Sequence, residues 1–346
     1  MRWLCGVWIL GAAMLTGAES VHTVVATVDL VRGQLGEHKK DGQIASSLHK
    51  WKLCESLDEH TVEELQSLGA GPKTTEELER LRMESVDYPA PKVVPKFDSP
   101  PVPSAEEQAR VVAQARAIAL NYTDSLPDFI AVESIRRYSD EHGPWRLKDT
   151  LTIKLSYFEK SEDYKVLTVN GHPSMLSYEA VGGTITQGEF GSLLREVFEP
   201  RSKADLHWDH WTNLRGRPAN VFFFRVHVDN SRYQMVVGNR GERQTITAGQ
   251  HGYVYVDRET SQIVHIFSEA ESIPDKFPVR NSSTSLDYGF ADVGGKQFLL
   301  PLRAVVRMGT ASLQTRNEVE FHSYRKFGAE SSISFGDAVP DKPAKE

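Results

Sequence analysis

Apolar and polar side chains alternate along much of the chain after residue 129. The clearest example is residues 150–157, where every second side chain is apolar: Leu151, Ile153, Leu155 and Tyr157. A period of two places these four side chains on one face of a strand and the polar residues between them on the other. Short polar turns join the segments with this pattern. The sequence therefore predicts a large antiparallel sheet, with one face on a core and the other in water.

The predicted strands follow one another as hairpins, which favours a meander whose order in space follows the order in the sequence. Asn170-Gly171 is typical of a tight turn with positive backbone angles. Phe222 and Phe224 flank a third phenylalanine, which indicates a strand covered on both faces. The predicted strand ranges are 150–157, 164–169, 206–214, 219–228, 233–237, 253–256, 263–267, 283–290, 298–308 and 317–324.

One helix interrupts this series of strands. Thr186 and Glu189 mark its start and Pro200 its end, with apolar side chains at helical spacing between them. Such a stripe must pack on another apolar surface. The stripe comprises Phe190, Leu193, Leu194, Val197 and Phe198.

The region from 21 to 88 has a different period. Asp58 is predicted to cap a helix over 59–68, and Thr74 with Glu77 forms the capping box of a further helix. We expect a small helical module, which is more often an interaction or docking module than an enzyme. The apolar positions that recur every three or four residues before these caps are Val24, Val28, Val31, Leu35, Ile44, Leu48 and Trp51.

Prolines separate this module from the strands. Their density over 89–103 forbids a helix or a central strand and indicates a semi-rigid linker. Ser104 and Glu107 then form a capping box for a helix that ends near Tyr122. The second domain is predicted to span residues 104–335, and the charged tail 336–346 is predicted to be disordered.

The first eighteen residues are typical of a secretory signal peptide. Arg2 precedes the apolar run from Trp3 to Leu15, and small residues up to Ala18 suit a signal peptidase. The run is shorter than the ~20 residues that cross a bilayer, so we expect cleavage, no transmembrane anchor and a soluble periplasmic or secreted protein. Cys54 is then the only cysteine, which excludes an intramolecular disulfide. A net charge of −7 without a long basic block argues against nucleic acid as a partner.

The segment His207-Trp208-Asp209-His210-Trp211 is the strongest candidate for a metal site. Alternation along a strand places His207 and Asp209 on one face and His210 on the other, so the ligands do not converge easily. His227 on the partner strand could approach one of them, but histidine and aromatic pairs across strands are the ordinary alternative. We predict no metal site and no cofactor.

Signatures of catalysis are missing from the sequence. It contains no Gly-x-Ser-x-Gly, His-Glu-x-x-His, phosphate loop or dinucleotide-binding glycine pattern. A glycosidase needs only two carboxylates. Glu133, Asp149, Glu159 and Asp163 are among many that could supply them, and no spacing selects a pair. Binding is therefore favoured over enzymatic activity, and no catalytic residue is predicted.

A late hairpin carries a resemblance to a known family. Residues 252–257 read Gly-Tyr-Val-Tyr-Val-Asp and are followed by a second strand over 260–266. With the signal peptide, the opening helix and the single embedded helix, this resembles the periplasmic lipoprotein-carrier superfamily of LolA, LolB and RseB. It also resembles an uncharacterised branch of exported bacterial proteins. The resemblance covers residues 126–335 and implies an α+β protein: an open antiparallel β half-barrel with embedded helices, preceded by a small all-α module.

The resemblance implies a carrier or sensor of lipid or lipoprotein in the cell envelope. An unclosed barrel exposes a concave apolar face that suits acyl chains, because burying each methylene is worth ~0.8 kcal/mol. The embedded helix can fill this face, leave it partly open or move aside. We therefore expect a hydrophobic or acylated ligand there. The candidate contacts are Leu151, Ile153, Leu155, Tyr157, Phe190, Leu194, Phe198, Phe222 and Phe224.

Two alternatives remain open at the level of sequence. One is a structural or interaction protein with a sealed barrel, whose helical module docks an envelope protein. The other is a carboxylate-based hydrolase of envelope material.

Overall fold

A computed structural model describes residues 20–86, 88–95, 101–140, 145–184, 190–214, 217–238 and 244–327. Contacts within the chain divide it into two compact units, residues 1–100 with 212–218 and residues 101–211 with 219–346. The predicted signal peptide, 1–18, and the predicted disordered tail, 336–346, lie outside the described residues. Among the helices in the described ranges, none is both long enough and apolar enough to cross a membrane.

The first unit is built from helices around a small apolar core. Val28, Ile44, Leu65 and Leu78 come from different helices and meet in one buried cluster. This explains the three- to four-residue spacing of apolar positions, which puts one side of each helix against the others. The elements are β1 (Ser20–His22), α1 (Val24–Gly36), α2 (Asp41–Leu48), β2 (Trp51–Leu53), α3 (Glu59–Ser67) and α4 (Pro72–Glu84).

Two details of the predicted helical module are wrong. Trp51 belongs to strand β2, which pairs in parallel with β1, and its ring stacks on His22 with 3.5 Å between centroids. Helix α4 begins at Pro72, because the fixed backbone angle of proline suits the first helical position. Thr74 therefore lies inside the helix and does not form its cap.

Asp41, on α2, caps α4 from a distance in the sequence. Its Oδ1 accepts hydrogen bonds from the Thr74 hydroxyl at 2.7 Å and the Thr74 backbone N–H at 2.9 Å. Its Oδ2 accepts from the Lys73 N–H at 2.9 Å. Burial acts to raise the pKa of Asp41, but these hydrogen bonds outweigh it and the pKa is lowered. Asp58 caps α3 as predicted, accepting from the Thr61 N–H at 2.7 Å.

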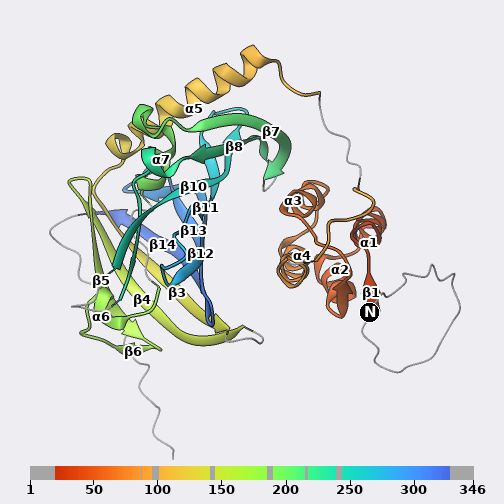
Figure 1. Ribbon diagram of the computed structural model, residues 1–346, viewed down its shortest axis with the longest axis horizontal. Coiled ribbons are helices and arrows are strands. Elements are labelled where there is room, and N and C mark those ends of the chain that lie inside the picture. Colours follow the sequence, from red (N-terminus) through yellow and green to blue (C-terminus); the bar gives the residue numbers. More distant parts are fainter. Residues whose placement is uncertain are drawn as a thin grey trace, which may run out of the picture. The chain divides into compact units, whose positions relative to one another are not determined.

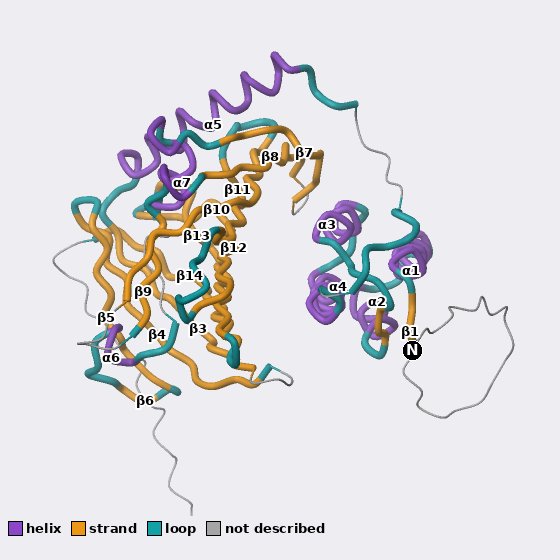
Figure 2. The backbone as a smooth tube through the Cα atoms, in the orientation of Figure 1, coloured by secondary structure: helices purple, strands orange, loops and turns teal. Residues whose placement is uncertain are grey.

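The second unit contains one large antiparallel sheet (Figure 1). Its longest strands, β12 and β13, each have 15 residues. Figure 2 shows that strands make up most of this unit. The strands are β3 (Phe129–Asp140), β4 (Arg146–Phe158), β5 (Ser161–Val169), β6 (His172–Pro173), β7 (Asp205–Leu214), β8 (Arg217–Val226), β9 (Tyr233–Val237), β10 (Gln244–Asp257), β11 (Ile263–Glu271), β12 (Val279–Val293), β13 (Lys296–Thr310) and β14 (Gln314–Lys326).

The order of the strands defines an open half-barrel. The order is β6-β5-β4-β3-β14-β13-β12-β11-β10-β8-β7, and β9 pairs with the other half of β10. Strands β10 to β14 form the predicted meander, whereas β3 pairs with β14 in the middle of the sheet. The sheet curls, and β6 and β7 remain as its two edges (Figure 1). The predicted α+β fold with an unclosed antiparallel barrel is confirmed.

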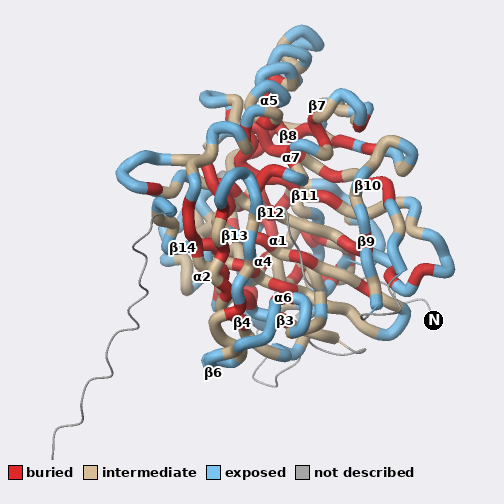
Figure 3. The backbone as a smooth tube through the Cα atoms, turned by 90° about the vertical axis from the view of Figure 1, so that its left-hand side faces the viewer, coloured by how far each residue is buried: buried red, intermediate tan, exposed pale blue. Residues whose placement is uncertain are grey.

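Two helices cover one end of the strands. Helix α5 (Ala105–Ser125) and helix α7 (Ser192–Phe198) lie beyond the same end of the sheet in both Figure 1 and Figure 3. Ser104 caps α5 as predicted, since its Oγ accepts from the Glu107 N–H at 3.2 Å. The exposed turns of α5 face away from the sheet in Figure 3. The residues of α5 that are buried are Val111, Ala115, Ala119 and Tyr122.

The embedded helix starts later than predicted. Its N-cap is Gly191, with φ of 124°, and Phe190 lies before the helix. A Cβ on Gly191 would come within 2.6 Å of the Thr123 side chain, so this close approach to α5 requires glycine. The predicted start signals Thr186 and Glu189 lie outside the described residues. A short helix that was not predicted, α6 (Tyr178–Val181), precedes it.

Candidate functional site: the concave face of the sheet

The concave face carries an unbroken row of apolar side chains, here called the apolar belt. Each member is the register partner of the next, so the belt crosses the sheet from β5 to β8. Alternation along every strand explains this, because residues in register share a face. The apolar belt consists of Val169, Leu151, Ile135, Val319, Ala304, Leu286, Ile266, Val254 and Phe222.

All of the predicted ligand contacts lie in the one core cluster that contains this belt. None of the nine is more than 2% exposed. Leu151 and Phe222 are in the belt itself. The others come from the same face of β4 and β8 or from the segment that covers it: Ile153, Leu155, Tyr157, Phe224, Phe190, Leu194 and Phe198.

Phe190 and helix α7 lie over this face and are here called the cover. Phe190 anchors it. Its ring lies 5.2 Å from that of Phe129, 5.7 Å from that of Phe321 and 6.1 Å from that of Tyr157, measured between centroids. Aromatic pairs at these separations contribute about 0.5–1.5 kcal/mol beyond their buried area. Phe129 also stacks on Tyr157 at 5.1 Å, so the end of the concave face nearest α5 is an aromatic cluster.

Polar contacts hold α7 at its exposed side. The Glu196 carboxylate accepts hydrogen bonds from the Arg232 backbone N–H and, at 3.3 Å, from the Ser231 hydroxyl. Arg195 donates to the Thr123 hydroxyl at 3.2 Å. Burial raises the pKa of Glu196, and the Ser231 hydrogen bond offsets this only in part. The cover is therefore held by side-chain packing on one side and by a few hydrogen bonds on the other.

One row beyond the belt, toward the β3–β4 turn, the concave face becomes polar. Asp149, Arg137 and Asn317 are register partners on β4, β3 and β14. Along the same row, beyond the apolar Val306 on β13, lie Thr284 and Ser268, on β12 and β11. We call the five polar residues the polar row. It lies between the main core cluster and a smaller one that includes Met235, Ala248, Phe277 and Val279.

Arg137 and Asn317 bind the backbone of residues 182–184, here called the strap. The Arg137 guanidinium donates from Nε and Nη2 to the two oxygens of Asp149 at 2.6 Å each, and from Nη1 to the Gly182 carbonyl. The Asn317 amide donates to the Thr184 carbonyl at 2.6 Å. Both donors are buried, with Arg137 5% and Asn317 4% exposed. No sequence pattern singled out Arg137 or Asn317, although alternation from Ile135 places Arg137 on the inner face.

Gln250 is a further buried amide on the concave face, at strand β10. Its Oε1 accepts from the Ser268 hydroxyl at 2.8 Å, which joins it to the polar row. Its Nε2 is buried and has no hydrogen-bond partner among the residues that the structure describes. Gln250 itself is completely buried. A buried amide donor without a partner is costly, so this atom is a natural contact for a ligand oxygen.

Two of the carboxylates considered for hydrolysis lie on this face. Asp149 is held in the ion pair with Arg137. Glu133 is in register with Ile153 and Phe321, one row on the other side of the belt, and is 3% exposed. Both are acidic groups inside the apolar site. No pair of carboxylates is singled out by their positions.

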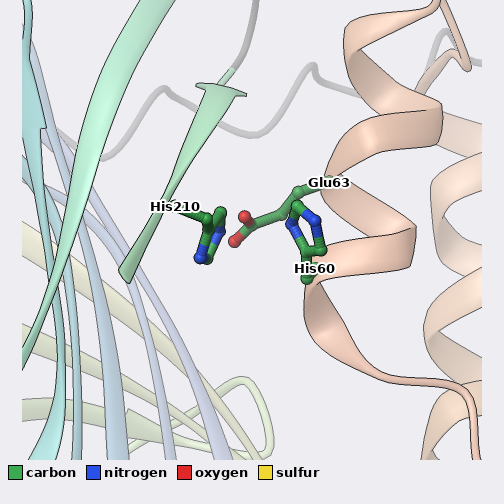
Figure 4. Close-up of side chains that lie close together, drawn as sticks. All are labelled: His60, Glu63 and His210. Atoms are coloured by element: carbon green, nitrogen blue, oxygen red, sulfur yellow. The ribbon is translucent and has the colours of Figure 1, made fainter. Parts of the chain in front are cut away.

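The histidine-rich segment lies on β7, outside the concave core. His207 packs its ring against Phe223 at 4.9 Å, which is the cross-strand pairing expected as the alternative to a metal site. The Nδ1 of His210 lies 2.6 Å from the Asp209 carboxylate. Figure 4 draws His210 on its strand, and it draws His60 and Glu63 one turn apart on α3. Within either unit taken alone, the described residues bring no three metal-binding side chains together.

The first unit has a shallow polar depression between α2 and α4. His49 Nδ1 lies 2.9 Å from Glu77 Oε1, and Arg80 Nε donates to the other oxygen of Glu77 at 2.8 Å. Burial acts to raise the pKa of Glu77, but these two contacts outweigh it and the pKa is lowered. The lining residues are Gly42, Ala45, Ser46, His49, Lys73, Glu76 and Glu77.

Comparison with known proteins finds likeness among solved structures. No family model and no curated protein matches the chain. A LolA superfamily protein from Nitrosomonas europaea is 10% identical, with a TM-score of 0.32, over 64% of this chain and 94% of that one. A DUF1329 family protein from Desulfovibrio piger is 10% identical, with a TM-score of 0.29, over 64% and 95%.

A third structure is described as an outer membrane lipoprotein-sorting protein domain from Vibrio parahaemolyticus. It is 11% identical, with a TM-score of 0.30, over 67% of this chain and 97% of that one. At such identities and TM-scores the likeness concerns the fold alone, and no ligand, activity or partner is carried over from it.

Proposed function

We propose that this protein binds a hydrophobic or lipidated ligand on the concave face of its open β-barrel. It would act as a carrier or sensor in the cell envelope, to which the predicted signal peptide directs it. The observation that carries the proposal is the apolar belt. A row of apolar side chains crosses nine strands without a break, and part of its cover is a single phenylalanine and a seven-residue helix.

A second sheet packed on this face would give a permanent core. The cover here includes a short segment entered through Gly191, beside the buried side of α5, and the ligand would replace Phe190 and the apolar side of α7. Replacement keeps the belt out of water, so the exchange needs no large net change in buried apolar area. Each methylene of an acyl chain that enters contributes ~0.8 kcal/mol.

The proposal is tested by measuring what the protein carries and what it takes up. Organic extraction of freshly purified protein followed by mass spectrometry should release an acyl-bearing molecule. Protein stripped in this way should then bind a fluorescent acyl probe. An empty extract together with no probe binding would instead support the sealed-barrel alternative, which the near-complete burial of the nine predicted contacts favours.

A pair of neighbouring substitutions on β13 localises the binding. Ala304→Leu adds bulk to the apolar belt, and we expect it to weaken probe binding by about tenfold, corresponding to ~1.4 kcal/mol. Arg303→Leu adds the same side chain on the opposite, exposed face and should leave binding unchanged. Equal effects of the two variants, or none from Ala304→Leu, would place the ligand elsewhere.

A further inference from the structure

The polar row raises a question about the ligand, since an apolar chain alone does not need it. Arg137, Asn317 and Gln250 direct hydrogen-bond donors into the concave face from β3, β14 and β10. The first two already bind oxygen atoms, namely the Gly182 and Thr184 carbonyls of the strap. Those oxygens are uncharged, and they show which kind of acceptor the donors suit.

The charges around these donors disfavour an anion. Asp149 takes two N–H groups of Arg137 in a bidentate pair and so neutralises the guanidinium. Glu133 adds a second acidic side chain to the same face. A carboxylate or phosphate entering here would meet Asp149 beside a guanidinium that Asp149 already neutralises, in a site where water cannot screen them.

The position of the polar row suits a group that lies between two carbon chains. The main apolar cluster is on one side of it and the smaller cluster, with Met235 and Phe277, is on the other. The carbonyl of an ester or an amide is flanked by apolar groups in this way. Gly183, with φ of 80°, lets the strap approach until a Cβ on it would lie 2.8 Å from Arg137 Nη1. The strap therefore occupies the space that such a carbonyl would take.

From these observations we infer that the polar row, together with Gln250, is a subsite for the uncharged carbonyl of an acyl ester or acyl amide. This inference rests on the proposed function and specifies its ligand. Arg137 and Asn317 donate to the ligand in place of the strap, and Gln250 supplies the donor that has no partner among the described residues.

The test compares two ligands of the same chain length, palmitic acid and methyl palmitate, on the full-length protein stripped of lipid. Displacement of a fluorescent acyl probe at pH 8 reports both affinities. We expect the ester to bind at least about tenfold more tightly than the ionised acid. Equal affinities, or tighter binding of the acid, would overturn the inference while leaving the proposed function intact.

Substitutions in the polar row sharpen the test. Asp149→Asn frees the charge of Arg137, and the acid should then bind more tightly than the ester. Asp163→Asn makes the same change on an exposed position of β5 and should preserve the wild-type preference. Gln250→Leu should weaken ester binding several-fold without favouring the acid.

The ligand comparison on the unmodified protein stays decisive even if Asp149→Asn does not fold. Failure of the proposed function has a separate signature, in which the acyl probe itself does not bind to any form of the protein. Binding of the probe with an unchanged ester preference in both Asp149→Asn and Gln250→Leu would contradict the subsite alone.

Discussion

The two units of this protein close their apolar cores in different ways. In the first, helices of 8 to 13 residues surround the core, and Asp41 joins two of them through three hydrogen bonds. In the second, a broad sheet supplies one wall, and part of the other is Phe190 with a helix of seven residues. The contrast separates a core closed by several joined helices from one closed in part by a single short helix.

Replacing one buried leucine in each core by alanine should give the largest difference between the two units in free energy of unfolding. Leu78→Ala, in the first unit, removes a side chain enclosed by several helices, and we expect a loss of about 3–5 kcal/mol. Leu194→Ala, in α7, should cost only about 2 kcal/mol because the short helix can shift into the space. Urea denaturation of each variant measures both losses. Equal losses would show that α7 is as rigid as the helices of the first unit.

The effect of crowding at the strap on stability can be separated from the effect of its positive φ angle by a pair of glycine substitutions. Gly183 and Gly171 have similar φ angles, 80° and 77°, but only Gly183 faces Arg137. Either substitution by alanine should cost ~1–2 kcal/mol through the positive φ. Gly183→Ala should cost more and should also increase uptake of an acyl probe, because the strap moves off the concave face. Identical stabilities and identical uptake would contradict this role of the strap.

Removing the cap of α4 should affect the first unit by a smaller amount. Asp41→Asn weakens hydrogen bonds to Thr74 and Lys73, and we expect a loss of about 1 kcal/mol at pH 7. Because the pKa of Asp41 is lowered in the folded protein, its contribution is present above the unfolded pKa and is lost as pH falls through the folded value. Thermal melts of the wild type should show this loss below about pH 4, and those of Asp41→Asn should not.

Lowering the pH should stabilise the cover of the second unit, whereas it weakens the cap of α4. The pKa of Glu196 is raised by burial, so protonation stabilises the folded state. That contribution is fully present below the unfolded pKa of about 4.3 and is lost as pH rises through the folded pKa. Glu196→Gln should remove this pH dependence, with the smallest change in melting temperature of the set. Hydrogen-exchange protection factors at α7 that do not change with pH in the wild type would contradict it.

Local patterns in the sequence were enough to predict most of the sheet. Alternation defines the inner face of β4 from Leu151 to Tyr157, and the positive φ angles of Asn170 and Gly171 confirm the turn predicted there. The meander from β10 to β14 follows because hairpins need only short-range information. The nine predicted contacts fall in one cluster for the same reason, since each lies on the apolar side of its own element.

Long-range partners could not be predicted in this way. Asp41 caps α4 from more than thirty positions away in the sequence, and no residue near Thr74 indicates this contact. Arg137 is on the inner face by alternation, but its partners in the strap depend on how the segment after α6 crosses the sheet. Trp51 was assigned to a helix because its spacing fits one, whereas pairing with β1 decides its conformation. Such contacts depend on tertiary structure that no short window of sequence contains.

The pairing of β3 with β14 has a consequence for how the second unit forms as the chain is made. Phe129 is the register partner of Lys326, so the middle of the sheet joins segments made almost two hundred residues apart. A chain that is synthesised from its N-terminus delivers β3 long before β14. Until β14 arrives, β3 has one unpaired edge and β13 another, and both can pair with the wrong strand. Folding of this unit therefore has to wait for the last strand, which makes protection of the emerging chain part of its biogenesis.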